Sequence, residues 1–328
     1  MKTLLQSVIG VSLAAGLLYL TYRNMSLEEI WANVSKADPT MVILAGCCLL
    51  AVFLFRGLRW QMMLDATEYS VGKYNTVLAV LVGYLVNTAT PRLGEVARCT
   101  LLYRTDKVPV ATSFGTVFSE RVVDLVVLLL GLGVIFLLEV ERLAGLFRDI
   151  FTNLATMLEG SQNILIGLGV IGLIGLGVLI WLLRAKSFQE GLIGKVKAFL
   201  QGMIDAAKSI FKLKNPFLFF VHTFMIWASL VAMTWCFMEA LPITRELSLY
   251  YSFLVLLIGG IGWALPTPGG MGTTHAIVTQ LFIAMELSGE AGKTIALLSN
   301  GGTNLYTILF GFIGLVLAWL VVMKVGKK

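Results

Sequence analysis

The chain has 328 residues, of which 58% are hydrophobic and only 13% are charged, and its mean hydropathy is +0.87. A typical soluble domain has about 25% charged residues, so this composition excludes a soluble globular domain and indicates an all-α polytopic membrane protein. The formal net charge is +6, and the positions of Lys and Arg along the chain predict which side of the membrane each connection faces.

Six apolar runs are long enough to cross a hydrocarbon core, which takes about 20 residues of helix. They are residues 4–22, 40–55, 122–140, 164–183, 217–237 and 303–323. We interpret the first run as a retained span. It is longer than the roughly 7–15 apolar residues of a signal peptide, and Tyr22 and Arg23 stand where a cleavage site would have small residues.

Two shorter apolar segments, residues 76–89 and 250–265, each run into a Pro/Gly cluster. The first continues through a charged stretch to residues 108–119. The second is interrupted by Gly259, Gly260 and Gly262 and returns through residues 274–285. Irregular backbone at membrane depth must be buried in protein or line a watery cavity, so we predict two re-entrant or tight helical hairpins.

The basic residues are concentrated in residues 56–107, 184–214 and 324–328. The positive-inside rule places these regions and both termini in the cytoplasm, provided that each hairpin enters and leaves on one side. The order span, hairpin, span then occurs twice in opposite orientations, at about residues 40–140 and 217–323 of a single domain, residues 1–328. Inverted repeats with broken helices indicate a transport site near the bilayer midplane.

Charged residues cluster at three places where spans end or begin. A charge at the bilayer centre costs about 2.5–3.5 kcal/mol on insertion scales, so such residues mark either a substrate pathway or a packing network. A simpler interpretation exists for each cluster: interfacial anchoring, a basic cytoplasmic loop, or a self-satisfied helix start. The clusters are Arg56 with Arg59; Arg92, Glu95 and Arg98; and Glu120, Arg121 and Asp124.

The first hairpin tip has the chemistry of an anion site. We expect Pro91 to end the preceding helix and Gly94 to allow a tight turn. A helix that begins near Gly94 would present free N–H groups at the tip beside Arg92, and such an end attracts phosphate. Glu95 and Arg98 are three residues apart and are predicted to pair on one helix face.

Spacing also predicts local contacts for the other polar residues. Glu120, Arg121 and Asp124 can form an intrahelical network in which Arg121 neutralises one carboxylate and leaves the other for Arg92, Arg98 or a ligand. At the second tip, "ALPTPGGMGTTHA", Thr273 and His275 begin the returning helix and can offer hydroxyl and imidazole contacts. Weaker candidates are Asn300 and Asn304, which are expected to bond across helices.

Four segments, "FRGLRWQMML", "GYLVNTATPRLGEVAR", "FGTVFSERVVDLVVL" and "LPTPGGMGTTHA", together resemble the lysylphosphatidylglycerol synthase transmembrane family, also called the flippase-like family. The resemblance implies a bacterial inner (plasma) membrane protein that moves a polar lipid between leaflets. Because the sequence stops soon after its last span, we expect no synthase activity. The family-like positions are Arg56, Arg59, Asn87, Pro91, Arg92, Gly94, Glu95, Arg98, Glu120, Arg121, Asp124, Pro266, Pro268, Gly269, Gly270 and Gly272.

We therefore expect a lipid translocase whose substrate is a phospholipid or a polyprenyl-phosphate-linked lipid. A membrane enzyme that acts on a lipid-linked substrate, with Glu120 or Asp124 as base, and a scaffold subunit stay open as alternatives. No P-loop, G-x-S-x-G, HExxH or C-x-x-C motif occurs in the sequence, so we expect no cofactor, no metal and no nucleic acid. The possible partner is a separately encoded lipid-modifying enzyme, and the oligomeric state stays open.

Overall fold

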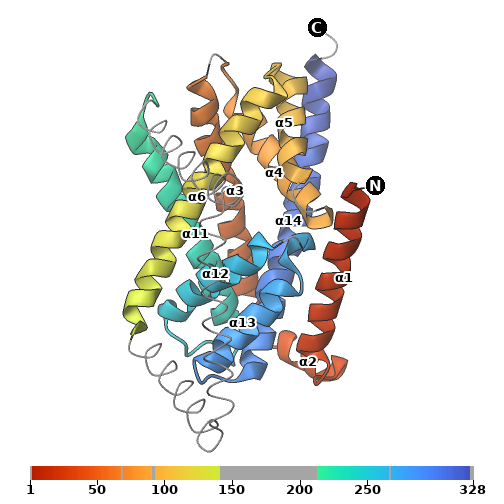
Figure 1. The fold of residues 1–328 in the computed structure, drawn as a ribbon, viewed down its shortest axis with the longest axis vertical. Coiled ribbons are helices and arrows are strands. Elements are labelled where there is room, and N and C mark those ends of the chain that lie inside the picture. The colour runs from red at the N-terminus through yellow and green to blue at the C-terminus, as the bar shows by residue number, and fades with distance from the viewer. Residues whose placement is uncertain (1, 68, 91–92, 141–212, 266, 326–328) are drawn as a thin grey trace, which may run out of the picture. The chain divides into compact units, whose positions relative to one another are not determined.

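The computed structural model describes residues 2–67, 69–90, 93–140, 213–265 and 267–325. These residues form helices joined by short connections, and no strand occurs among them. The helices are α1 (Lys2–Tyr22), α2 (Leu27–Val34), α3 (Pro39–Asp65), α4 (Lys73–Ala89), α5 (Leu93–Asp106), α6 (Val110–Leu138), α11 (Pro216–Ala240), α12 (Leu249–Ala264), the 3₁₀ turn η2 (Pro268–Gly270), α13 (Thr273–Ala284) and α14 (Gly289–Val325) (Figure 1).

Helix starts follow ordinary capping chemistry. The carboxylate of Asp38 accepts a hydrogen bond from the backbone N–H of Thr40 at 2.8 Å, and Pro39 occupies the first turn of α3. At the start of α11, the side chain of Asn215 accepts from the N–H of Leu218 at 3.1 Å. Such residues satisfy N–H groups that a helix leaves without internal partners, so local sequence fixes where these two long helices begin.

Four described helices, α3, α6, α11 and α14, are long and apolar enough to cross a membrane. They include the predicted spans at residues 40–55, 217–237 and 303–323. They also include the predicted span at 122–140 except for its last two residues, because α6 ends at Leu138. Residues 10–22 of α1 and residues 249–264 of α12 form shorter apolar helices. The predicted span at 164–183 lies outside the described residues. The protein is therefore a multi-pass membrane protein.

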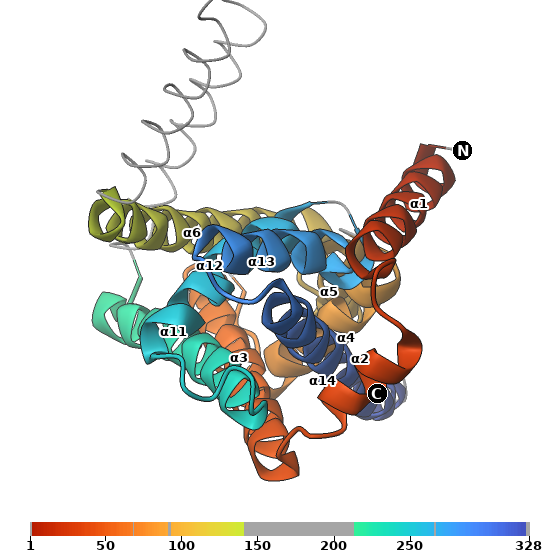
Figure 2. The ribbon, with the colours of Figure 1, turned by 90° about the horizontal axis from the view of Figure 1, so that it is seen from below.

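The chain divides into two compact units, residues 1–121 with 210–328 and residues 122–209. In the first unit α3 and α11 lie side by side, and α14 packs against α4 and α13 (Figures 1 and 2). A buried apolar core joins these helices; it includes Phe53, Trp60 and Phe237. The charged residues Arg56, Arg59, Arg98, Glu120 and Arg121 all belong to this unit.

Two helix pairs, α4 with α5 and α12 with α13, occupy the positions of the predicted hairpins. In the first pair, however, the returning helix is the charged stretch itself, α5. Residues 108–119, expected to form the return, instead largely belong to the 29-residue helix α6, which continues into the predicted span. The turn η2 of the second pair lies against α4, so the break in one pair is next to the other pair.

The second break depends on glycine. Gly269, Gly270 and Gly272 have φ angles of 56°, 67° and 79°, values that side chains with a Cβ rarely adopt. The amide nitrogens of Asn300 and Asn304, on α14, donate to the carbonyl oxygen of Gly269 at 3.0 and 2.9 Å. The predicted bonding of these asparagines across helices is thus confirmed, and it fixes η2 to α14.

The glycines of α12 have a different role from the one that the sequence suggested. α12 is continuous from Leu249 to Ala264, so Gly259, Gly260 and Gly262 do not break it. A Cβ atom at Gly262 would come within 2.7 Å of the backbone nitrogen of Thr274. The small residue is therefore needed because α13 packs closely against α12.

Candidate functional site

A buried glutamate surrounded by arginines forms the centre of the site. Glu120, on α6, has one carboxylate oxygen 2.9 Å from Nη1 of Arg98, on α5. Its other oxygen lies 3.3 Å from Nη2 of Arg59 and 3.5 Å from Nη1 of Arg56, both on α3. All four side chains are buried. Three helices thus contribute to one ion network in the interior of a membrane protein.

Aromatic and hydroxyl groups hold the arginines in place. The guanidinium of Arg98 lies 4.6 Å from the ring centroid of Trp60, and the guanidinium of Arg59 lies 5.7 Å from that of Phe219. Arg59 also donates to Oγ1 of Thr223 at 3.3 Å. A desolvated cation over an aromatic ring gains about 2 kcal/mol, so these contacts restrict the arginines to one arrangement.

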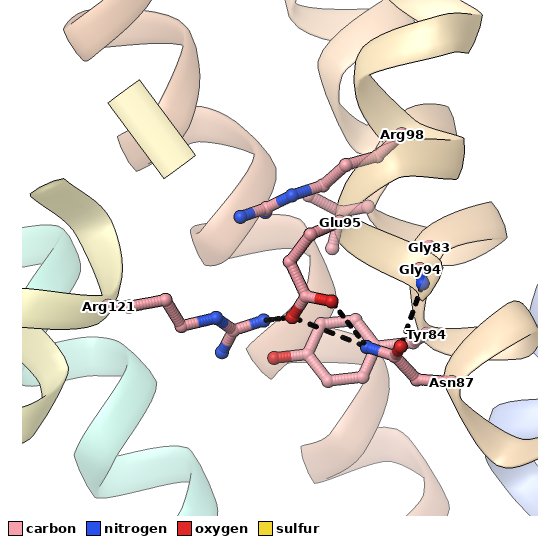
Figure 3. A pocket seen from close by; sticks show the side chains of 8 residues that line it. Gly83, Tyr84, Asn87, Gly94, Glu95, Arg98 and Arg121 are labelled. Carbon is pink, nitrogen blue, oxygen red and sulfur yellow. Dashed lines mark hydrogen bonds and ion pairs between the residues drawn. The ribbon is translucent and has the colours of Figure 1, made fainter. Parts of the chain in front are cut away.

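A second ion pair lies beside the first break. Nη2 of Arg121 is 3.1 Å from Oε1 of Glu95, and the amide nitrogen of Asn87 is 3.5 Å from both oxygens of that carboxylate (Figure 3). The side-chain oxygen of Asn87 accepts from the backbone N–H of Gly94 at 2.8 Å. The side chain of Arg121 is 39% exposed and that of Glu95 is 19% exposed, so this pair is much nearer the surface than the pairs of Glu120.

A pocket connects the two ion networks. It is lined by α4, α5 and Arg121, with Gly83 and Tyr84 on one wall and Glu95 and Arg98 on another (Figure 3). The pocket is narrow and has no room for a water molecule between its walls. Among the described residues, Nε and Nη2 of Arg98 have no hydrogen-bond partner, although Arg98 is only 3% exposed.

Comparison with protein families decides what kind of protein this is. A family model described as "Lysylphosphatidylglycerol synthase TM region" matches residues 7–311. The chain belongs to this family. The predicted resemblance is thus confirmed, and membership of the lysylphosphatidylglycerol synthase TM region family indicates a membrane function related to lipids.

Similar proteins occur in archaea. The chain is 31% identical over 108 residues to a UPF0104 membrane protein of Methanocaldococcus jannaschii. This aligned stretch covers 32% of this chain and 32% of the relative. It is 25% identical over 290 residues to a UPF0104 membrane protein of Methanothermobacter thermautotrophicus, covering 84% of this chain and 83% of the relative. It is 23% identical over 336 residues to the glycosyltransferase AglD of Haloferax volcanii, covering 92% of this chain but 53% of AglD. No solved structure matches the chain significantly.

The structure brings most of the predicted charged residues together, but with different partners. Glu95 pairs with Arg121, where an intrahelical pair with Arg98 was predicted. Arg98 pairs with Glu120, which is one of the partners that the sequence offered for the carboxylates of Glu120 and Asp124. Arg56 and Arg59 join the network of Glu120 and are buried, whereas their simpler interpretation was anchoring at the membrane surface.

Other predicted site residues lie elsewhere or play structural parts. Gly94 is inside α5 and gives no turn; a Cβ there would overlap the carbonyl oxygen of Gly83, so the glycine allows α4 and α5 to touch. Thr273 and His275 are buried at the start of α13, where His275 accepts from the N–H of Gly272 at 3.2 Å. Asp124 is half-buried on α6, one turn after Glu120. Pro91, Arg92 and Pro266 lie outside the described residues.

Sequence reasoning missed the aromatic and hydroxyl groups around the arginines. Trp60 directly follows Arg59, and the sequence suggested a tryptophan at the membrane interface; instead it is buried beside the guanidinium of Arg98. Thr223 lies on α11, 164 residues from Arg59, and nothing in its own segment marks it. No group of three or more His, Cys, Asp or Glu side chains that could hold a metal occurs among the described residues.

Proposed function

We propose that this protein moves an anionic lipid between the leaflets of the membrane and binds the phosphate of the headgroup through Arg98. The substrate is a phospholipid or a polyprenyl-phosphate-linked lipid. Two observations support the lipid part of this proposal. The chain belongs to a family whose description names a lipid synthase, and its fold is that of a multi-pass membrane protein.

The observation on which the proposal depends is the state of Arg98. Its guanidinium is buried, is held by Glu120 and Trp60, and has two nitrogens, Nε and Nη2, without hydrogen-bond partners among the described residues. A guanidinium fork matches the geometry of phosphate oxygens. A buried donor without an acceptor is costly, so a phosphate oxygen that reaches the pocket of Glu95 and Arg121 would gain strong bonds there.

Entry of a headgroup requires the pocket to open, because the pocket has no room even for a water molecule. The pair of Glu95 and Arg121 is the part nearest the surface, and a partly exposed ion pair is weak. In the proposed cycle the phosphate displaces Glu95 from Arg121 and then contacts Arg98. Glu95, Glu120 and Asp124 are the acidic groups that could exchange a proton during this cycle.

The proposed placement in the membrane follows the distribution of basic residues. Both termini lie in the cytoplasm, the α4–α5 and α12–α13 pairs are re-entrant, and the two halves form an inverted repeat with the breaks near the midplane. The membrane is the plasma membrane, and a separately encoded lipid-modifying enzyme supplies or consumes the lipid.

Replacing Arg98 with lysine is expected to slow lipid translocation at least about tenfold, because lysine keeps the charge beside Glu120 but loses the fork. The measurement is transbilayer movement of fluorescent phospholipids and of a fluorescent polyprenyl phosphate in proteoliposomes. Arg104→Gln is the matched control, since Arg104 lies on the same helix and is exposed. Movement no faster than in empty liposomes for every lipid tested, with the unmodified protein, contradicts the proposal.

The second candidate is an enzyme that acts on a lipid-linked substrate. It is favoured by one observation, the name of the relative AglD, a glycosyltransferase. The chain matches only about half of AglD, so the transferase activity of that protein does not by itself extend to this one. Mass spectrometry of the lipids from the same proteoliposomes separates the candidates, because a translocase leaves the lipid mass unchanged.

A further inference from the structure

Uncharged hydroxyl and carbonyl oxygens lie close together inside the protein at the break between α12 and α13. Oγ1 of Thr273 lies 2.9 Å from Oγ1 of Thr267, 2.8 Å from the carbonyl oxygen of Gly262 and 3.1 Å from that of Gly270. Each hydroxyl has only one proton to donate, so Thr273 cannot satisfy both carbonyl oxygens. In addition, the residue four positions after Gly262 is Pro266, which has no N–H group for the next helical bond.

Two further oxygens at the same break have no hydrogen-bond partner among the described residues: Oγ1 of Thr274 and Oδ1 of Asn304. Thr274 is 5% exposed and Asn304 is 7% exposed. Both atoms face the turn, because a Cβ at Gly270 would come within 2.9 Å of Oγ1 of Thr274, and a Cβ at Gly269 would overlap Oδ1 of Asn304. Buried polar atoms of this kind call for a partner, and both oxygens have lone pairs that a cation can use.

We propose that this break binds Na⁺. Carbonyl oxygens of unwound backbone and the C-terminal ends of half-helices are the groups that coordinate Na⁺ in broken-helix transporters, and α12 ends here with the negative end of its dipole. Ca²⁺ and Mg²⁺ are bound mainly through carboxylates, whereas the oxygens of this break belong to hydroxyl, amide and carbonyl groups. Oγ1 of Thr273 lies 2.8–3.1 Å from three of these oxygens, and so close a spacing suits the small Na⁺ ion better than the larger K⁺ ion.

The Na⁺ site is connected through α4 to the pocket of Arg98. The role of Na⁺ in transport rests on the proposed lipid translocation. η2 packs against α4, the helix that carries Asn87 and lines the pocket of Arg98. An ion that holds η2 in place can therefore favour one position of α4, and a Na⁺ gradient would supply the energy for lipid movement.

The test of ion binding uses purified protein in detergent without added lipid substrate. We expect the melting temperature to rise with Na⁺ and to saturate, with little or no rise for K⁺ or choline at equal ionic strength, because a ligand of the folded state stabilises it. Equal melting temperatures in Na⁺, K⁺ and choline overturn the Na⁺ site. Because no lipid has to move in this experiment, its failure leaves the translocation proposal to its own test.

Thr274→Val locates the ion. Since the hydroxyl of Thr274 makes no hydrogen bond among the described residues, we expect this variant to be at least as stable as the unmodified protein in choline, but to lose the response to Na⁺. Thr307→Val is the matched control: Thr307 is similarly buried, and its hydroxyl donates within α14, to the carbonyl oxygen of Thr303 at 2.7 Å. If both variants respond to Na⁺ as the unmodified protein does, the ion is not at this break.

Discussion

Glu120→Gln is expected to lower the free energy of unfolding by about 3–5 kcal/mol, the usual cost of removing one partner from a buried ion pair. Glu120 is 1% exposed and has Arg56, Arg59 and Arg98 as ion-pair partners. Glutamine fits the same space but removes the negative charge from among three buried guanidinium groups. The measurement is unfolding in mixed micelles with increasing SDS, followed by tryptophan fluorescence.

Glu95→Gln is the control for this prediction. It makes the same chemical change in a carboxylate whose partner, Arg121, is 39% exposed. Solvent screens such a pair, so we expect a loss below about 1 kcal/mol. Equal losses for the two variants would mean that the network of Glu120 is no more important for stability than a surface ion pair, and that its role is confined to function.

The contrast between these two glutamates also shows how far sequence reasoning reaches. Because charge is costly in a membrane, the sequence indicates that Arg56, Arg98 and Glu120 belong to a substrate pathway or a packing network. Spacing rules then suggested partners three or four residues away, because i to i+4 contacts are what one sequence can reveal. The structure places the partners on other helices, and the packing of α3, α5 and α6 decides which ones meet.

The helix breaks and their glycines give a second example. Breaks near Pro91 and Pro268 were predictable, since proline and glycine interrupt helices by local chemistry. A sequence does not show whether a given glycine turns the chain or admits a neighbour, because both need a missing Cβ. Gly269 has a positive φ and turns the chain, whereas Gly262 lies within a continuous helix and admits α13. The backbone conformation of Gly269 and the position of α13 beside Gly262 distinguish them, and both belong to the folded structure.

Gly94→Ala tests the close contact that the sequence did not predict. The added methyl would overlap the carbonyl oxygen of Gly83 and come within 2.6 Å of the side chain of Asn87. Because Gly83 presents backbone there, α4 and α5 must move apart, and forcing an extra methyl into a packed interface costs about 1–3 kcal/mol. The shift would also move Arg98, one turn further along α5, so lipid translocation is expected to fall together with stability.

Gly115→Ala provides a control of opposite sign. A Cβ at Gly115, on α6, would meet nothing within 4 Å, and alanine within a helix is favoured over glycine by about 0.5–1 kcal/mol. Unfolding of both variants in mixed micelles should therefore show one less stable and one more stable than the unmodified protein. If Gly94→Ala were also stabilising, the backbones of α4 and α5 could not touch at Gly83 and Gly94, and the position of Arg98 beside Glu120 would lose its structural basis.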